Sequence, residues 1–286
     1  MRHILTLTLM AMSVCAEAQT FDYGTYSDGT NTLQYRVAQT NEGQDGPAIM
    51  VTYLHGGSSV GEDNEKNLAS FMETNILPYL QAHSVKALVF VPQCPSGRIW
   101  SESGQTQPMS ATLKSAIAQV ASEYGITDNL FLMGGSAGGT GSWRMLSENP
   151  GYFKAALIAA GNPQGLDYEA IAKTPVYCVL SKADKVIKYA SAYPEIAKIR
   201  QLPGADITLQ VLSDASHAET CTGAYTDEAL DKVFSYATLS VDDVLADDNA
   251  APVAVYDIRG RRMAAPTQGL NIIRYSDGTM RKVFLR

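Results

Sequence analysis

The feature that most constrains the fold of this chain is a series of short, almost purely apolar runs, several of them separated by stretches with helical spacing. The runs that have the length of a β-strand are 48–54, 87–91, 130–133, 155–160, 176–180 and 207–212. Strands that are apolar on both faces are typical of a parallel sheet covered by helices on both sides. We therefore expect an α/β fold with a doubly wound, mostly parallel sheet and right-handed crossovers.

Apolar residues at helical spacing lie between several of these runs. The pattern predicts helices over 64–83, 111–124 and 136–148, the first of them opened by residues of the capping type. Upstream, 21–26 and 32–38 are expected to be antiparallel strands at the edge of the sheet. The length of 286 residues suits one such domain with a small appendage.

The first 18 residues have the pattern of a secretory signal peptide. A short basic start precedes an apolar run over 4–14 and the small-x-small sequence at 16–18. This run is too short to anchor the chain in a bilayer, and Val14 before Cys15 does not fit a lipidation signal. We expect a secreted protein (periplasm, cell surface or extracellular) with no integral membrane segment once the signal is removed.

Charge and cysteine content narrow the partners and the chemistry. The net charge of −7 disfavours nucleic acid as a partner, because phosphate backbones are bound by clustered Lys and Arg. Cys94, Cys178 and Cys221 remain after signal removal, and their odd number leaves at least one outside any intrachain disulfide. The spacing does not indicate which pair would bond. None of them clusters with histidine as metal ligands do, so we expect no metal and no cofactor.

The composition changes after residue 240. The acidic stretch 241–251 indicates a linker, and the segment 252–286 that follows contains about three short strand-like runs. These runs are 253–258, 270–275 and 280–285. Such a segment is too small to bury a sizeable core alone. We therefore divide the chain into a signal peptide (1–18), a main α/β domain (19–240), the linker and a C-terminal β unit.

The strongest chemical signal is the pentapeptide Gly134-Gly135-Ser136-Ala137-Gly138, which fits the pattern G-x-S-x-G. An apolar strand precedes it immediately, and a helical pattern begins directly after it. In this strand–turn–helix setting a tight turn lifts the serine hydroxyl above the sheet edge, where it can act as a nucleophile. The backbone N–H of Ala137 would then lie at a helix N-terminus and donate to an oxyanion.

A serine hydroxyl needs a general base to act as a nucleophile, and the chain has only four histidines. His3 leaves with the signal peptide, and His83 ends a predicted helix. His55 follows an apolar run and precedes two glycines, which is where an oxyanion loop belongs, with the Gly57 N–H as second donor. His217 lies on a polar loop after the last of these runs and is left as the base.

The acid that orients the histidine should lie between the serine and the histidine, after a strand. Asp184 follows the run 176–180 and is our candidate. Asp214 is the alternative, but it shares the loop of His217, a geometry less suited to reaching Nδ1. The sequence thus predicts a triad of Ser136, His217 and Asp184 that works by acyl transfer.

Substrate contacts are also suggested by three aromatic side chains. Trp100 and Trp143 are candidates for stacking on a sugar or an aromatic acyl group, with a core position as the alternative. His55 is a third candidate, because it lies next to the predicted oxyanion loop.

Several motifs at a joint spacing carry a family resemblance. They are Leu54-His55-Gly56-Gly57, Gly61-Glu62-Asp63-Asn64, Val91-Pro92-Gln93-Cys94-Pro95 with Trp100, and 134–139. Together they resemble the feruloyl-esterase-like branch of the α/β-hydrolases, which is similar to family 1 carbohydrate esterases and to hydrolases labelled predicted peptidases. The likeness covers about residues 45–220. It implies the α/β-hydrolase fold, the triad assigned above, and cleavage of acetyl or feruloyl esters on plant polysaccharide.

The C-terminal segment carries a second resemblance. The stretch from Val255 to Arg262 and the final run through Arg286 look like the sorting tails of type IX secretion in Bacteroidetes. The resemblance implies that the type IX machinery is a partner. The alternative is a small packing extension without an address function.

Two other functions stay open at this point. A serine peptidase would use the same triad, and the lack of a propeller or cap domain before the core disfavours it mildly. A non-catalytic carbohydrate-binding surface protein could keep the fold, but it would have no physical need of all three triad residues.

Overall fold

The computed structural model describes residues 19–44, 48–102, 108–237, 251–257, 261–267, 269–276 and 280–285. They fall into two compact units, one up to Thr238 and one from Leu239 onward, and each is described by itself. The predicted signal peptide and nearly all of the predicted linker lie outside the described residues. No helix among the described residues is long and apolar enough to cross a membrane.

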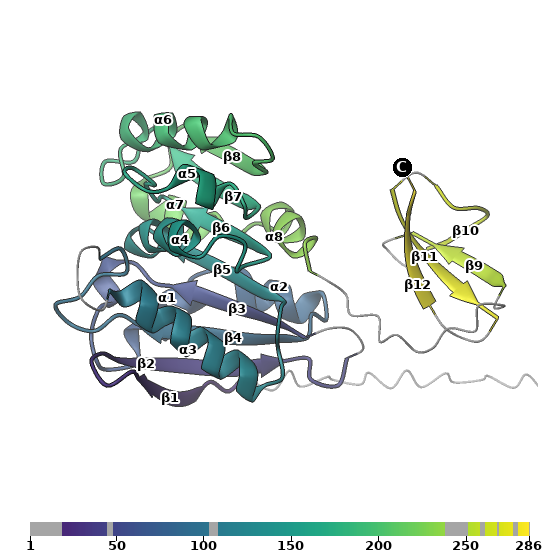
Figure 1. Cartoon of the computed structure of the whole chain (residues 1–286), viewed down its shortest axis with the longest axis horizontal. Coiled ribbons are helices and arrows are strands. Elements are labelled where there is room, and N and C mark those ends of the chain that lie inside the picture. The colour runs from purple at the N-terminus through teal and green to yellow at the C-terminus, as the bar shows by residue number, and fades with distance from the viewer. Residues whose placement is uncertain are drawn as a thin grey trace, which may run out of the picture. The chain divides into compact units, whose positions relative to one another are not determined.

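An eight-stranded sheet forms the frame of the first unit (Figure 1). Its strands are β1 (Asp22–Ser27), β2 (Thr32–Thr40), β3 (Ile49–Leu54), β4 (Ala87–Gln93), β5 (Leu130–Gly135), β6 (Ala155–Ala159), β7 (Val176–Ser181) and β8 (Ile207–Leu212). They lie in the order β1-β2-β4-β3-β5-β6-β7-β8. The pairs β1–β2 and β2–β4 are antiparallel, and all pairs from β4 to β8 are parallel. The predicted doubly wound sheet with an antiparallel edge is confirmed.

Helices cover both faces of this sheet. They are α1 (Lys66–Met72), α2 (Ile76–Ala82), α3 (Met109–Glu123), α4 (Ala137–Glu148), α5 (Tyr168–Ile171), α6 (Tyr189–Arg200), α7 (His217–Gly223) and α8 (Asp227–Phe234). Alternate side chains of a strand point to opposite faces. In β5, Leu132 packs in one core with α3 to α6, whereas Phe131 and Met133 pack in the other core with α1, α2 and α8. The central strands, such as β5, are apolar because both of their faces are buried, whereas the edge strand β1 is polar and largely exposed.

The prediction of one helix over 64–83 is wrong, because the chain forms α1 and α2 there with a break between them. At the break the Thr74 hydroxyl donates to the Phe71 carbonyl at 2.7 Å, and it accepts from the N–H of Ile76 at 3.3 Å. Such local side-chain bonds compete with the helical hydrogen-bond pattern. Phe71 and Ile76 are fully buried on either side of the break, so the helical spacing in the sequence was real although the helix is interrupted.

The second unit is a small antiparallel sheet. Its strands are β9 (Pro252–Tyr256), β10 (Arg262–Met263), β11 (Gly269–Tyr275) and β12 (Met280–Leu285), in the order β10-β9-β11-β12. Three of them match the strand-like runs expected from the sequence. The two-residue β10 was not predicted, because it is too short to show an apolar period. Asn271 and Ile273 of β11 are buried.

Candidate active site

Ser136 stands in a strained turn between β5 and α4. Its backbone has φ 57° and ψ −120°, a conformation that non-glycine residues rarely adopt and that is often found at functional sites. The neighbouring glycines make the turn possible, because at these positions other backbone atoms lie too close for a side chain. A Cβ on Gly138 would lie 1.9 Å from the carbonyl oxygen of Leu54, and one on Gly134 would lie 2.7 Å from the carbonyl oxygen of Gly138. The turn therefore presses against the end of β3, and no larger residue fits.

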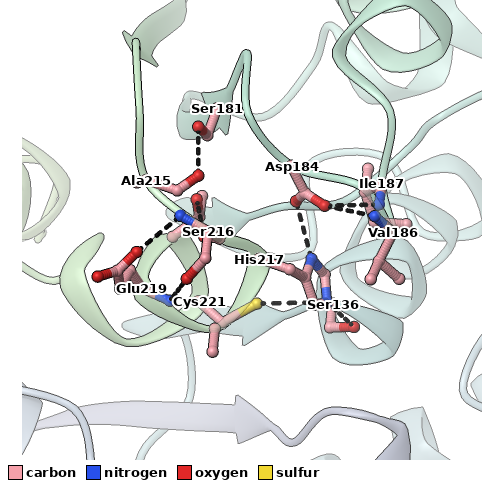
Figure 2. A network of polar contacts seen from close by, with 12 residues as sticks. Ser136, Ser181, Asp184, Val186, Ile187, Ala215, Ser216, His217, Glu219 and Cys221 are labelled. Carbon is pink, nitrogen blue, oxygen red and sulfur yellow. Dashed lines mark hydrogen bonds and ion pairs between the residues drawn. The ribbon is translucent and has the colours of Figure 1, made fainter.

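A chain of hydrogen bonds connects Ser136, His217 and Asp184 (Figure 2). His217 Nε2 lies 2.7 Å from Ser136 Oγ, and its Nδ1 lies 2.8 Å from Asp184 Oδ2. The other carboxylate oxygen of Asp184 accepts from the N–H groups of Val186 at 2.8 Å and Ile187 at 2.9 Å. The Asp184 side chain is 1% exposed and that of His217 is 20% exposed. Nδ1–H can thus donate to a fixed, buried carboxylate while Nε2 accepts from the serine hydroxyl.

The start of α7 holds His217 in place, because this histidine is the first residue of the helix. Ser216 before it forms a capping box with Glu219, with bonds of 3.3 Å and 2.7 Å. The Ser181 hydroxyl at the end of β7 donates to the carbonyl of Ala215 at 2.6 Å, which ties the same loop to the sheet (Figure 2). The spacing Ser-x-x-Glu is a capping signal, and it was overlooked in the sequence.

The two candidate acids lie differently in the structure. Asp184 contacts His217 directly, as described above. Asp214 is exposed, and among the described residues no hydrogen bond joins it to His217. The structure therefore places Asp184, and not Asp214, next to His217.

Two backbone amides lie next to Ser136. Ala137 begins α4 and Gly57 begins the 3-10 helix η1 (Gly57–Ser59), and the first N–H groups of a helix have no partner within it. A Cβ built on Gly56 would lie 3.6 Å from the Cβ of Ser136, and one on Gly57 would lie 3.9 Å from the Cβ of Ala137. The two loops meet because β3 and β5 are adjacent parallel strands. This is an arrangement in which two amides can serve one oxyanion.

His55 lies behind this loop. It is fully buried, and its Nε2 accepts from the N–H of Cys94 at 2.9 Å. The ring proton is therefore on Nδ1, which donates to the carbonyl of Gly56 at 2.7 Å. Burial lowers the pKa of His55 to about 4, so the ring is neutral near pH 7. Its role is to hold the glycine loop.

The two tryptophans are buried as well. Trp100 Nε1 donates to the carbonyl of His55 at 3.1 Å, and the two rings meet edge to face. Trp143 lies in the core under α4 with no exposed surface. The structure thus places Trp100, Trp143 and His55 behind the site and not against the space beside Ser136, because their rings are needed to fill the interior.

A cavity of about 360 Å³ opens beside Ser136 and His217. Its lining also includes Tyr53, Gly56, Gly57, Ser58, Ser70, Glu73, Gly135, Ala218, Cys221 and Thr222. Sequence reasoning missed most of these residues, since they come from β3, the end of α1 and α7. The described residues contain no group of three His, Cys, Asp or Glu side chains placed to hold a metal ion.

Among the residues that line the cavity, Cys221 lies close to His217. Its Sγ is 3.9 Å from His217 Nε2, and burial raises the pKa of the thiol to about 12. The spacing of four residues within one helix would have indicated this contact if α7 had been predicted. Cys94, Cys178 and Cys221 are all free thiols in the structure.

The mostly parallel sheet, with Ser136 in a tight turn at the carboxyl end of β5, defines an α/β-hydrolase. Residues 95–246 match the dienelactone hydrolase family, and the chain belongs to this family. A sequence search among curated proteins finds no match.

Solved structures of esterases share the fold. A thermostable esterase is 22% identical with a TM-score of 0.66 over 75% of this chain, which spans 62% of that esterase. A ferulic acid esterase from the anaerobic fungus Anaeromyces mucronatus is 13% identical with a TM-score of 0.58, and covers 79% of this chain and 94% of its own. An acetyl xylan esterase from Aspergillus awamori is 13% identical with a TM-score of 0.57, over 76% of this chain and 100% of its own. At these identities the likeness concerns the fold.

Proposed function

We propose that this protein hydrolyses carboxylic esters through an acyl-enzyme on Ser136. The observation that carries the proposal is the continuous pair of hydrogen bonds, 2.7 Å and 2.8 Å long, from the Ser136 hydroxyl through His217 to Asp184. The cavity that opens on the same serine supplies the room for a substrate.

The reaction follows from the geometry. His217 Nε2 takes the hydroxyl proton as Ser136 Oγ attacks the ester carbonyl, and Asp184 stabilises the resulting imidazolium. The N–H groups of Gly57 and Ala137 donate to the negative oxygen of the tetrahedral intermediate. Nε2–H then protonates the leaving alcohol. A water molecule, deprotonated by the same nitrogen, hydrolyses the acyl-enzyme and restores the serine.

For the substrate we propose acetyl or feruloyl esters on plant polysaccharide. The support is the family resemblance of the motifs and the names of two structural neighbours, a ferulic acid esterase and an acetyl xylan esterase. The cavity of about 360 Å³ lies at the lower end of the range usual for small-molecule sites, which accommodates either acyl group.

We also propose that the protein is exported, with 1–18 as a cleaved signal and 252–286 as a type IX sorting segment. The support is the sequence pattern of both segments. Mass spectrometry of the exported protein should find an N-terminus at Gln19. Residues 239–286 fused to a reporter should direct it out of a host that has the type IX machinery, and a reporter retained in the periplasm would contradict the sorting role.

The direct test compares the chain from Gln19 onward with Ser136→Ala and with Ser122→Ala, a control on the exposed face of α3. Substrates are p-nitrophenyl acetate, methyl ferulate and acetylated xylan. We expect turnover in the parent and the control, and a loss of at least ~10³-fold in Ser136→Ala. The ratio among the substrates separates acetyl from feruloyl preference.

Three outcomes would contradict the proposal. Activity that survives Ser136→Ala would refute the nucleophile. Peptide cleavage without ester cleavage by the parent would favour a peptidase, and carbohydrate binding without any turnover would favour a binding protein.

A further inference from the structure

The cavity beside Ser136 carries charge of one sign. Glu73 is the one carboxylate among the described residues that line it, and neither lysine nor arginine is among them. Glu73 is exposed and caps the C-terminal end of α1. Among the described residues no ion pair neutralises it. A substrate that enters therefore meets an uncompensated negative charge.

The negative charge of Glu73 affects another residue of the cavity lining. Tyr53 lines the same space, and its pKa is raised to about 12, mainly by burial and in smaller part by the charges of Cys221 and Glu73. The Tyr53 hydroxyl lies 3.2 Å from Ser70 Oγ, which is also part of the lining. Because Glu73 and Ser136 line the same cavity, the carboxylate acts on a group bound beside Ser136.

Besides the His217 ring, the Cys221 thiol and the hydroxyls of Ser136 and Tyr53, the lining carries three further hydroxyl groups. They belong to Ser58, Ser70 and Thr222, and each has an oxygen that can accept a hydrogen bond. The Thr222 hydroxyl donates to the Ala218 carbonyl at 3.1 Å. A carboxylate accepts hydrogen bonds strongly, so sugar hydroxyls can donate to Glu73 while the serines and the threonine pair with others. A carboxylate on the substrate would meet no lysine or arginine among the described residues of the lining and would be repelled by Glu73.

We propose that Glu73 determines specificity by charge, so that this cavity accepts uncharged, hydroxylated esters such as those of neutral sugars and discriminates against esters that carry a carboxylate near the scissile bond. The inference rests on the proposed function of Ser136 and names the substrate class of that same site.

The test uses two ester pairs, in each of which an uncharged group of one member is replaced by a carboxylate in the other. On the alcohol side the pair is methyl 3-acetoxybenzoate and 3-acetoxybenzoate, and on the acyl side p-nitrophenyl valerate and mono-p-nitrophenyl glutarate. The ratio of kcat/KM, neutral over anionic, is measured for the parent, Glu73→Gln, Glu73→Lys and Glu123→Lys. Glu123→Lys changes the net charge by the same amount as Glu73→Lys. Glu123 belongs to α3, which lies on the face of the sheet opposite to α1.

We expect the parent to prefer the neutral ester of at least one pair. Glu73→Gln should reduce that ratio by about 3- to 10-fold, as for two charges roughly 7 Å apart at a partly hydrated site. Glu73→Lys should reduce it further, and Glu123→Lys should leave it within about twofold, because charges beyond a Debye length are screened. An unchanged ratio in both Glu73 variants would overturn the inference.

The experiment separates this inference from the proposed function. Loss of turnover in Ser136→Ala tests the nucleophile, whereas the charge ratio is read only from variants that still turn over the neutral ester. If the Glu73 variants do not fold, the salt dependence of the parent decides. Turnover of the anionic ester should then rise severalfold between 0.02 M and 0.5 M NaCl relative to its neutral partner, and a flat response would overturn the inference.

Discussion

His55 is expected to destabilise the protein as the pH falls below 6.5. The ring is fully buried, accepts from the Cys94 N–H and donates to the Gly56 carbonyl. Protonation of Nε2 would remove the acceptor for a buried N–H and place a charge in the interior. Burial accordingly lowers the pKa of His55 from 6.5 to about 4 in the folded state.

The sign and the size of the effect follow from proton linkage. In the unfolded chain His55 binds its proton near pH 6.5, but in the folded protein only near pH 4. Between these values the unfolded state binds more protons, so the free energy of unfolding falls as the pH falls. A pKa that moves from 6.5 to about 4 lowers this free energy by about 2 kcal/mol between pH 7 and pH 5, and by about 3 kcal/mol at pH 4.

Urea unfolding at pH 7 and pH 5 measures this loss, with the fluorescence of the buried Trp100 and Trp143 as the signal. His55→Gln cannot titrate, so it should lose about 2 kcal/mol less than the parent over the same range. Carboxylate groups titrate in the same way in both proteins, so their contribution cancels in the difference between the two losses. His83→Gln, which changes an exposed histidine, should behave as the parent does. Equal losses in the parent and in His55→Gln would refute the reasoning. If His55→Gln does not fold, an NMR titration of the parent that finds the His55 pKa near 6.5 would refute it too.

Three further predictions concern the turn, the acid and the free thiol. Asp184→Asn should lower kcat by about 10⁴-fold with little change in the melting temperature, and a loss of less than tenfold in an ester assay would mean that other groups orient the histidine. Gly138→Ala should cost about 2–4 kcal/mol of unfolding free energy in urea titrations, because its Cβ would lie 1.9 Å from the Leu54 carbonyl oxygen. Gly223→Ala, with nothing within 4 Å of the added Cβ, should cost far less, and equal costs would contradict the steric argument. Modification of Cys221 by methyl methanethiosulfonate should be slow at pH 7 and faster as the pH rises, because the pKa of the thiol is raised to about 12, and it should block turnover. Inactivation of Cys221→Ser at the rate of the parent would show that another group reacts.

Much of the frame could be predicted from the sequence because it depends on local rules. A strand buried on both faces must be apolar throughout, so β3 to β7 are visible as continuous apolar runs. The turn at Ser136 is equally local, since the close approach of Gly134 and Gly138 leaves its trace in five consecutive residues. The scarcity of histidines then left one base, and the alternation of strands and helices placed one acid after β7.

The tertiary structure alone decided what surrounds these groups. Whether Trp100 or His55 faces a substrate or the interior depends on how the loops after β3 and β4 pack, and no spacing in the sequence reports it. Glu73 and Cys221 reach Ser136 from α1 and α7, elements far apart in the chain that the sheet order carries to one edge. Composition and period are properties of single segments, and they determined the sheet and the turn that carries Ser136. The cavity and its charge arise only where several segments meet, and for that reason they became visible only in the folded molecule.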